Sequence, residues 1–237
     1  MKITFEISPE YDAEMIFRML RGEDWFYRAT SMEIGKEFAE KIHNNQRQGK
    51  IQEEIKIFVK KAYKKFLPYI EKTKGLYQQS WQEIIKDFSK LVEELTIPWF
   101  YDKYVCIVTH FNQGISNWNG NVVGRWWKEN PYLQRRLTAH EIILAHYFSI
   151  HRNLYPDSGL RDTQIWALAE IAAFALTGLD KKINQLLPYQ VEGYYLSHNY
   201  PQIVELQKKL QTPFLKRKSF KEYIEEGIVE VKKYPNL

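Results

Sequence analysis

The sequence contains a single cysteine, Cys106, among 237 residues. One thiol cannot form an intramolecular disulfide, so a fold held together by disulfides is excluded. A chain of this length buries roughly 70% of the surface that its unfolded form exposes, and it therefore needs no cross-links to build a core. Cys106 stands within the apolar run YVCIVT, where we expect it to be a small core residue.

Long hydrophobic segments and targeting signals are also missing. The longest apolar run covers residues 165–179 and is interrupted by Glu170, which makes it too short and too polar to cross a bilayer. The N-terminal segment carries acidic residues where a signal peptide has an uninterrupted apolar stretch. These absences predict a cytoplasmic protein without a membrane partner.

Repeats, low-complexity tracts and Gly/Ser linkers are absent too. We therefore expect one domain over residues 1–237, with a mainly helical part at 1–95, a core at 99–180 and short helices at 181–237, separated by prolines. Ser8-Pro9 predicts a helix start. Three further starts have the spacing of a capping box, at Thr30/Glu33, Ser80/Glu83 and Ser219/Glu222. The predicted fold class is α+β and predominantly helical.

The net charge of +5 is a mild basic bias. Residues 51–74 place apolar side chains at helical spacing, with lysines on the other side between Lys56 and Lys65, and Pro68 is expected to kink or end this helix. The lysines could bind nucleic acid or acidic lipid, or they could form the solvated face of an amphipathic helix. No stacking aromatics interleave with them, so the solvated face is favoured. A basic helical nucleic-acid-binding protein, using these lysines with those at 208–209 and 216–218, is a further alternative.

Strand structure is predicted around residues 104–127. Residues 104–109 are β-branched and apolar, and the segment that follows is rich in Gly and Asn, as turns and hairpins require. Asn130-Pro131 predicts a helix over 131–152, and Asp162 is expected to cap a second helix that ends at Gly178. Together these features predict a small sheet with an edge hairpin, packed on the first helix.

Three residues on these helices could carry chemistry. His140 and Glu141 are adjacent on the first helix, and Glu170 lies on the second, which is apolar nearly all round. A buried carboxylate stays ionised only with a partner, since its desolvation costs several kcal/mol. A metal ion or a cationic side chain such as His140 would supply that partner.

This arrangement resembles the zincins, a family of zinc peptidases, in the branch whose third zinc ligand is a Glu on a following helix. His140-Glu141 matches the start of the H-E-x-x-H motif, and Trp166-x-Leu168-x-Glu170 is similar to the downstream helix. The resemblance covers roughly residues 99–180. It implies zinc as cofactor, His140 and Glu170 as ligands, Glu141 as general base, and a peptide or protein substrate.

The second ligand position departs from the motif, because Leu144 stands four residues after His140. The next histidine, His146, lies about 120° around a straight helix from His140. It could act as a ligand only after a π-bulge or break in the helix. The other possibilities are a distant ligand, such as His110 or His198, and a site that has lost its metal.

The Gly/Asn-rich segment offers candidate substrate-binding residues. Trp118, Asn119 and Asn121 could line a groove in which an extended peptide adds to the sheet edge, or they could simply form a turn. The sequence thus predicts a zinc-dependent peptidase-like protein, either active or inactive. The alternative is a peptide- or protein-binding module that keeps the zincin-like fold without its chemistry.

Overall fold

The computed structural model describes residues 1–22, 24–44, 48–111, 120–187 and 200–237. As predicted, it is predominantly helical, with a small sheet. Along the chain, the elements are β1 (Lys2–Glu6), α1 (Pro9–Met19), α2 (Asp24–Ile34), α3 (Lys36–His43), α4 (Gln48–Gln82), α5 (Ile85–Leu95), β2 (Lys103–Thr109), β3 (Val122–Trp126), α6 (Leu133–Leu154), α7 (Asp162–Phe174), the π-helical turn η1 (Ala175–Leu179), α8 (Lys181–Leu186), α10 (Pro201–Lys216) and α11 (Phe220–Val231).

The three strands form a parallel sheet in the order β1-β2-β3. The predicted hairpin is therefore wrong. After Thr109 the chain returns through residues 110–121 to the start of the sheet, where Val122 pairs with Val105. A connection of about a dozen residues is long enough for such a return, whereas a hairpin needs only a short turn. The first strand joins the N-terminal part of the chain to the core, because β1 pairs with β2.

The two edges of the sheet differ. At β1, the backbone N–H of Phe5 donates to Oε1 of Gln78 at 3.1 Å, and Nε2 of Gln78 donates to the carbonyl of Ile3 at 3.5 Å. Gln78 belongs to α4, so this helix caps the outer edge of β1. No described strand pairs with the outer edge of β3.

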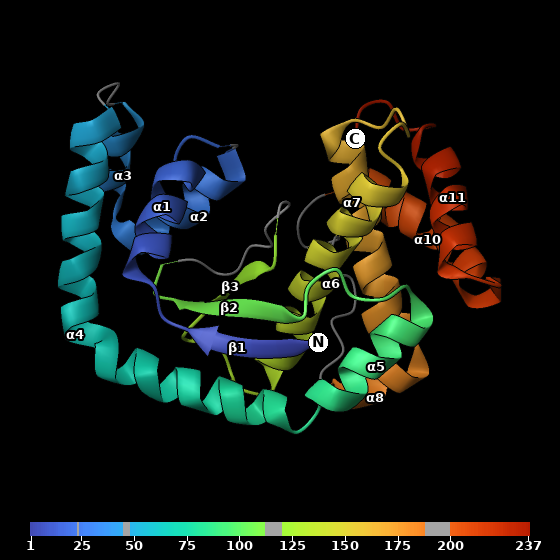
Figure 1. Ribbon diagram of the computed structural model, residues 1–237. Helices are drawn as coiled ribbons and strands as arrows, with labels where there is room; N and C mark the ends of the chain where they lie inside the picture. Colours follow the sequence, from blue (N-terminus) through green and yellow to red (C-terminus); the bar gives the residue numbers. More distant parts are fainter. Residues whose placement is uncertain (23, 45–47, 112–119, 188–199) are drawn as a thin grey trace.

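Helix α4 is continuous through Pro68 and bends sharply about midway along its length (Figure 1). The expected kink is thus present. Of the predicted helix starts, Ser8 and Ser219 are confirmed, since their Oγ atoms accept the N–H groups of Tyr11 and Glu222 at 3.1 Å.

Two predicted starts are wrong, because Thr30 lies inside α2 and Ser80 inside α4. The Ser80 hydroxyl has other partners: it donates to the carbonyl of Pro131 at 2.9 Å and accepts from Nε of Arg135 at 2.6 Å.

The helices after β3 lie where they were predicted, but some of their ends differ from the prediction. Helix α6 begins at Leu133, two residues after the predicted start, and its cap residue is Tyr132. Oδ1 of Asn130 accepts the N–H groups of Tyr132 and Leu133 at 2.9 and 3.3 Å. Arg161, not Asp162, is the cap residue of α7. Gly178 does not end that helix, because the chain continues into η1. Pro213 lies within α10 and does not separate two short helices.

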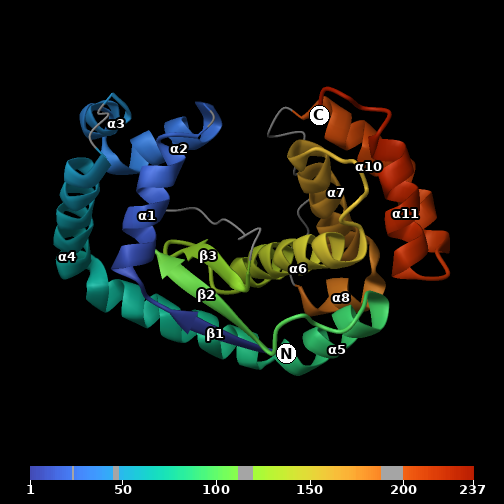
Figure 2. The same ribbon diagram turned by 45° about the horizontal axis from the view of Figure 1, so that its top comes forward.

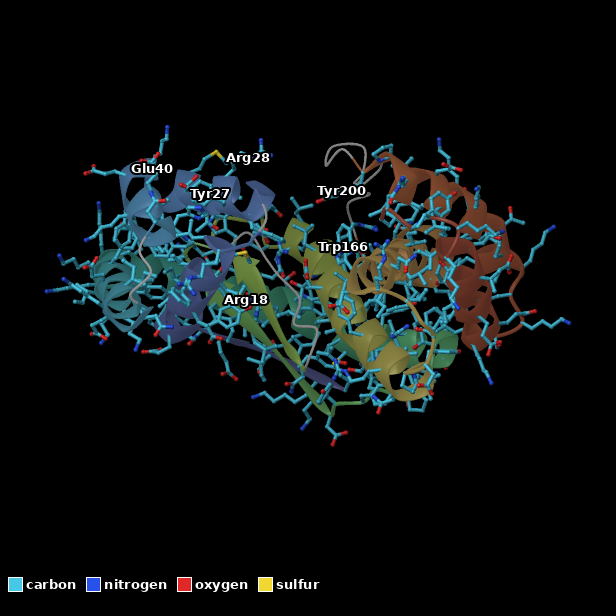
Figure 3. The ribbon with its side chains drawn as sticks, turned by 90° about the horizontal axis from the view of Figure 1, so that it is seen from above. Arg18, Tyr27, Arg28, Glu40, Trp166 and Tyr200 are labelled. Atoms are coloured by element: carbon cyan, nitrogen blue, oxygen red, sulfur yellow. The ribbon has the colours of Figure 1, made fainter. Side chains whose placement is uncertain are left out.

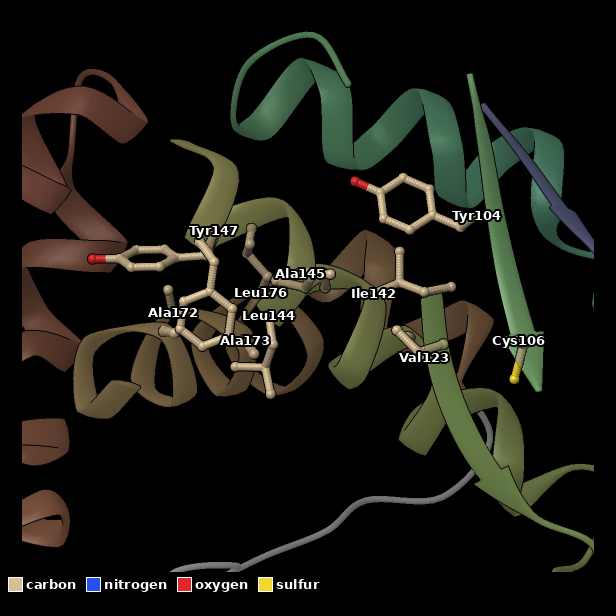
Figure 4. Close-up of a cluster of buried hydrophobic side chains, with 14 of the residues drawn as sticks. Tyr104, Cys106, Val123, Ile142, Leu144, Ala145, Tyr147, Ala172, Ala173 and Leu176 are labelled. Atoms are coloured by element: carbon tan, nitrogen blue, oxygen red, sulfur yellow. The ribbon is translucent and has the colours of Figure 1, made fainter. Parts of the chain in front are cut away.

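Helix α6 lies between the sheet and α7, and its two sides are buried against them (Figure 4). On one side, Ile142 faces Val123 and Tyr104 of the sheet. On the other side, Leu144 lies beside Ala173 of α7. Cys106 is fully buried in the sheet, and burial raises the pKa of its thiol.

Two groups of helices stand on either side of this centre. Figures 1 and 2 both show α1, α2 and α3 on one side of the sheet, and α7, α10 and α11 on the other. Within the described part of the chain, no helix combines the length and apolar character that crossing a bilayer requires.

Candidate functional site

The structure brings His140 of α6 and Glu170 of α7 into direct contact. Nε2 of His140 is 2.8 Å from Oε2 of Glu170, and the two side chains are only 15% and 8% exposed. The carboxylate on the apolar helix therefore has a cationic or hydrogen-bonding partner, as its burial requires. The two helices pack closely enough here that no other residue is needed to bridge the pair.

The contact changes the acidity of the imidazole. Burial opposes a charged ring, but the adjacent Glu170 carboxylate, with a smaller effect from Glu141, outweighs it and raises the pKa of His140. His140 thus holds its proton to a higher pH than a free histidine does.

Glu141 belongs to a second buried group of charges, centred on Arg125 of β3. Nη1 of Arg125 lies 3.8 Å from Oε1 of Glu141. Its Nε donates to Oε2 of Glu129 at 3.2 Å, and its Nη2 contacts the other carboxylate oxygen of Glu129. Arg125 is 3% exposed. Burial works against its charge, but the two carboxylates outweigh this and raise the pKa of Arg125.

Sequence reasoning missed Arg125 and Glu129. The available signal was an arginine in the middle of an apolar strand, which requires an acidic partner because an unpaired buried charge costs several kcal/mol. Glu129 follows it by four residues. Burial raises the pKa of Glu129, although Arg125 opposes this effect.

Tyr11 of α1 packs against Gly124 of β3, near the charge of Glu141. A Cβ at Gly124 would lie only 3.2 Å from the Tyr11 hydroxyl oxygen. The lack of a side chain at Gly124 therefore makes room for the Tyr11 ring. Burial, and then the charge of Glu141, raise the pKa of Tyr11, so its hydroxyl stays protonated. The site therefore combines side chains from α1, β3, α6 and α7.

These residues do not complete a zinc site. Two ligand atoms of a tetrahedral zinc, each bonded at 2.0–2.1 Å, are about 3.3 Å apart. The 2.8 Å between His140 and Glu170 is shorter, and the position of the second histidine is taken by Leu144, which is 2% exposed. Among the described residues, no group of three or more His, Cys, Asp or Glu is arranged to hold a metal ion.

His146 lies away from this pair. Its Nε2 is 3.3 Å from Oγ1 of Thr96, and its ring packs on Trp99 with centroids 4.5 Å apart. Helix α6 is an unbroken α-helix from Leu133 to Leu154, without the π-bulge that would turn His146 toward His140. The structure thus does not bring this predicted ligand to the site.

The other predicted residues are also accounted for. The backbone N–H of His110 donates to Asp12 Oδ2 at 2.6 Å, and its ring stacks on Phe111 at 4.4 Å. Asn121 donates from Nδ2 to the carbonyl of Lys103 at 2.7 Å, so it joins the starts of β3 and β2. The remaining three, Trp118, Asn119 and His198, lie outside the described residues.

Aromatic and cationic side chains lie on the two groups of helices that flank the site. Seen from above, Trp166 and Tyr200 belong to one group, with ring centroids 5.3 Å apart, and Arg18 and Arg28 to the other (Figure 3).

Comparisons were made with models of protein families, with curated proteins and with solved structures. None of the three finds a match to this chain.

Proposed function

We propose that the chain is a non-catalytic peptide- or protein-binding module with a zincin-like core. The observation that carries the proposal is the direct contact between His140 and Glu170 at 2.8 Å, next to the apolar Leu144. Two residues that would share a zinc ion in a zincin here bond directly to each other. A metal would have to separate them and would still lack a second histidine.

The general base of a zincin also has another partner. Glu141 interacts with Arg125, which is itself held by Glu129. Such a buried network is costly to disturb, because removing one member leaves an unpaired charge. This supports a structural role for Glu141, in which it fixes β3 against α6.

The outer edge of β3 is the proposed binding surface. In a parallel pair, alternate residues bond to the neighbouring strand, so the backbone of Val122 and Gly124 faces away from β2. The accessible part of this edge is around the half-buried Val122, because Gly124 is buried and the carbonyl of Trp126 already accepts from the Tyr77 hydroxyl at 2.7 Å. An extended peptide could add there as a further strand, with main-chain hydrogen bonds providing affinity. The edge of β1 does not offer this, since Gln78 already bonds to it.

A binding experiment with an unfolded polypeptide tests the proposal. Fluorescein-labelled casein is titrated with the protein and followed by anisotropy, with and without a chelator, and cleavage is followed by gel electrophoresis. We expect binding that the chelator does not change, and no cleavage. Val122→Pro removes an outward N–H without removing a bond to β2, and should weaken binding at least tenfold, while Val122→Thr should not. Equal binding by both variants would overturn the proposed surface.

The zinc peptidase is a second candidate, and one observation favours it. His140 and Glu170 meet, with Glu141 beside them, as the resemblance to zincins implies. Metal analysis of protein purified without chelator distinguishes the two candidates. Stoichiometric zinc that is lost in His140→Ala, together with casein cleavage, would establish the peptidase and refute the non-catalytic module.

A further inference from the structure

The outer side of α4 carries a cluster of exposed lysines. We define the α4 basic face as the exposed lysines and apolar residues on this side, which are Lys56, Ile57, Lys60, Lys61, Lys64, Lys65 and Leu67. The exposed Glu53 lies on the same side, one turn before Ile57, and pairs with Lys56. The opposite side of the helix is buried in the core through Ile55, Val59 and Tyr63. The face lies on the first half of α4, at the outside of the molecule (Figure 1).

Some exposed lysines of the other helices pair with a glutamate three or four residues away, whereas four consecutive exposed lysines of this face do not pair with a described glutamate. Such pairs include Lys36–Glu40, Lys90–Glu94, Lys209–Glu205, Lys221–Glu225 and Lys233–Glu230. Lys56 forms a pair of the same kind, with Glu53 at 3.9 Å. No ion pair to a described residue forms at Lys60, Lys61, Lys64 or Lys65. Like charges at this spacing destabilise a helix, so an anionic partner would relieve their repulsion.

Apolar side chains lie among the lysines. Ile57 is 47% exposed and Leu67 is 41% exposed. At 100° per residue, Ile57 falls between Lys60 and Lys61 around the helix, and Leu67 falls within about 20° of Lys60. The face therefore presents a patch of positive charge with an apolar side chain near each end.

We propose that the α4 basic face binds the surface of an anionic lipid bilayer. Lysine clusters on an amphipathic helix are attracted to acidic headgroups, and adjacent apolar side chains enter the interface. A nucleic acid fits less well, because the exposed aromatic ring nearest to the face, Tyr69, is directed toward Trp127 at a centroid distance of 6.5 Å. The lysines of α10 lie on the opposite side of the molecule and do not extend the patch (Figure 1).

Vesicle sedimentation tests this proposal. The full chain is mixed with vesicles of phosphatidylcholine alone, or with 30% phosphatidylserine, at low salt. We expect binding only to the anionic vesicles. Each lysine near such a surface contributes roughly fivefold in affinity, so replacing Lys60, Lys61, Lys64 and Lys65 by Gln should weaken binding at least 100-fold.

The matched control replaces four exposed lysines outside this face by Gln, so that it has the same net charge as the first quadruple variant. These are Lys86, Lys90, Lys181 and Lys221. We expect this control to bind anionic vesicles within a few-fold of the unaltered protein. Circular dichroism and an unchanged unfolding midpoint would show that both quadruple variants are folded. Equal losses in the two variants would mean that net charge, and not the α4 basic face, causes binding.

A second pair of variants separates lipid from nucleic acid. Ile57→Ser and Leu67→Ser keep the charge and should weaken vesicle binding several-fold, since insertion scales with the apolar area buried. Neither change should affect binding to a 30-nucleotide single strand. Tighter binding to the oligonucleotide than to anionic vesicles would overturn the proposal, as would the absence of vesicle binding at low salt.

Discussion

The imidazole of His146 packs against the indole of Trp99, with 4.5 Å between the ring centroids. It is 1% exposed, and burial lowers its pKa to about 4. His146 is therefore a neutral core residue at pH 7. Its contact with Thr96 places it on the side of α6 toward the segment that precedes β2.

This burial predicts an acid-dependent loss of stability. Because the folded pKa of about 4 lies below the unfolded value near 6.5, the unfolded state binds the proton first as the pH falls. The contribution of neutral His146 to the free energy of unfolding is fully present above pH 6.5. It decreases by up to about 3 kcal/mol as the pH falls toward 4. In His146→Phe, which keeps an aromatic ring on Trp99, urea unfolding at several pH values should show a smaller decrease. An unchanged decrease would mean that other groups cause it.

The His140–Glu170 pair predicts the opposite dependence at higher pH. The pKa of His140 is raised in the folded state, so its contribution is complete below pH 6.5 and is lost as the pH rises through the folded pKa. His140→Gln should reduce the free energy of unfolding by about 2 kcal/mol at pH 6. The difference from the unaltered protein should shrink toward pH 9. A constant difference across this range would contradict protonation of His140.

Removing the charge of Arg125 is expected to cause a large loss of stability. Arg125→Met leaves Glu129 and Glu141 buried without their cation, and breaking a buried pair costs about 3–5 kcal/mol. The control Lys103→Met removes an ion pair to Glu6 whose side chains are each 49% exposed, and should cost under about 1 kcal/mol. Guanidinium unfolding at pH 7 compares the two. Similar losses would show that the Arg125 network contributes little.

Replacing Leu144 by histidine is expected to create a metal-binding site. A histidine there would lie one helical turn from His140 and on nearly the same face, so Leu144→His restores the ligand spacing of a zincin. We expect about one zinc per chain by metal analysis, and about 2.7 kcal/mol of stabilisation at 100 times the dissociation constant. The control Ile142→His, about 160° around the helix from His140, should bind none. Equal zinc in both variants would count against the zincin resemblance.

The contact between His140 and Glu170 could be anticipated from sequence for a physical reason. A carboxylate in an apolar helix must find a partner, and the histidine on the preceding helix was close in the chain. The direction of β3 could not be anticipated in the same way. Gly and Asn residues mark a change of backbone conformation, but they do not fix whether the chain reverses beside Thr109 or returns to Val105.

Local capping signals also gave mixed results. The Ser219 hydroxyl accepts the N–H of Glu222 three residues later, as the capping pattern predicts. Ser80 has the same sequence pattern, yet tertiary structure gives it Pro131 and Arg135 as partners, both more than 50 residues away. Such distant contacts override a motif that spans four residues.

The cap that Gln78 places on β1 limits how copies of this chain could assemble. Growth of a fibril through the sheet needs two open edges on every subunit, one to receive a strand and one to offer it. Here one edge is already bonded to α4. If two copies paired through β3, neither copy would have an open sheet edge left. Assembly would then end with a dimer, so the sheet cannot propagate into an open polymer.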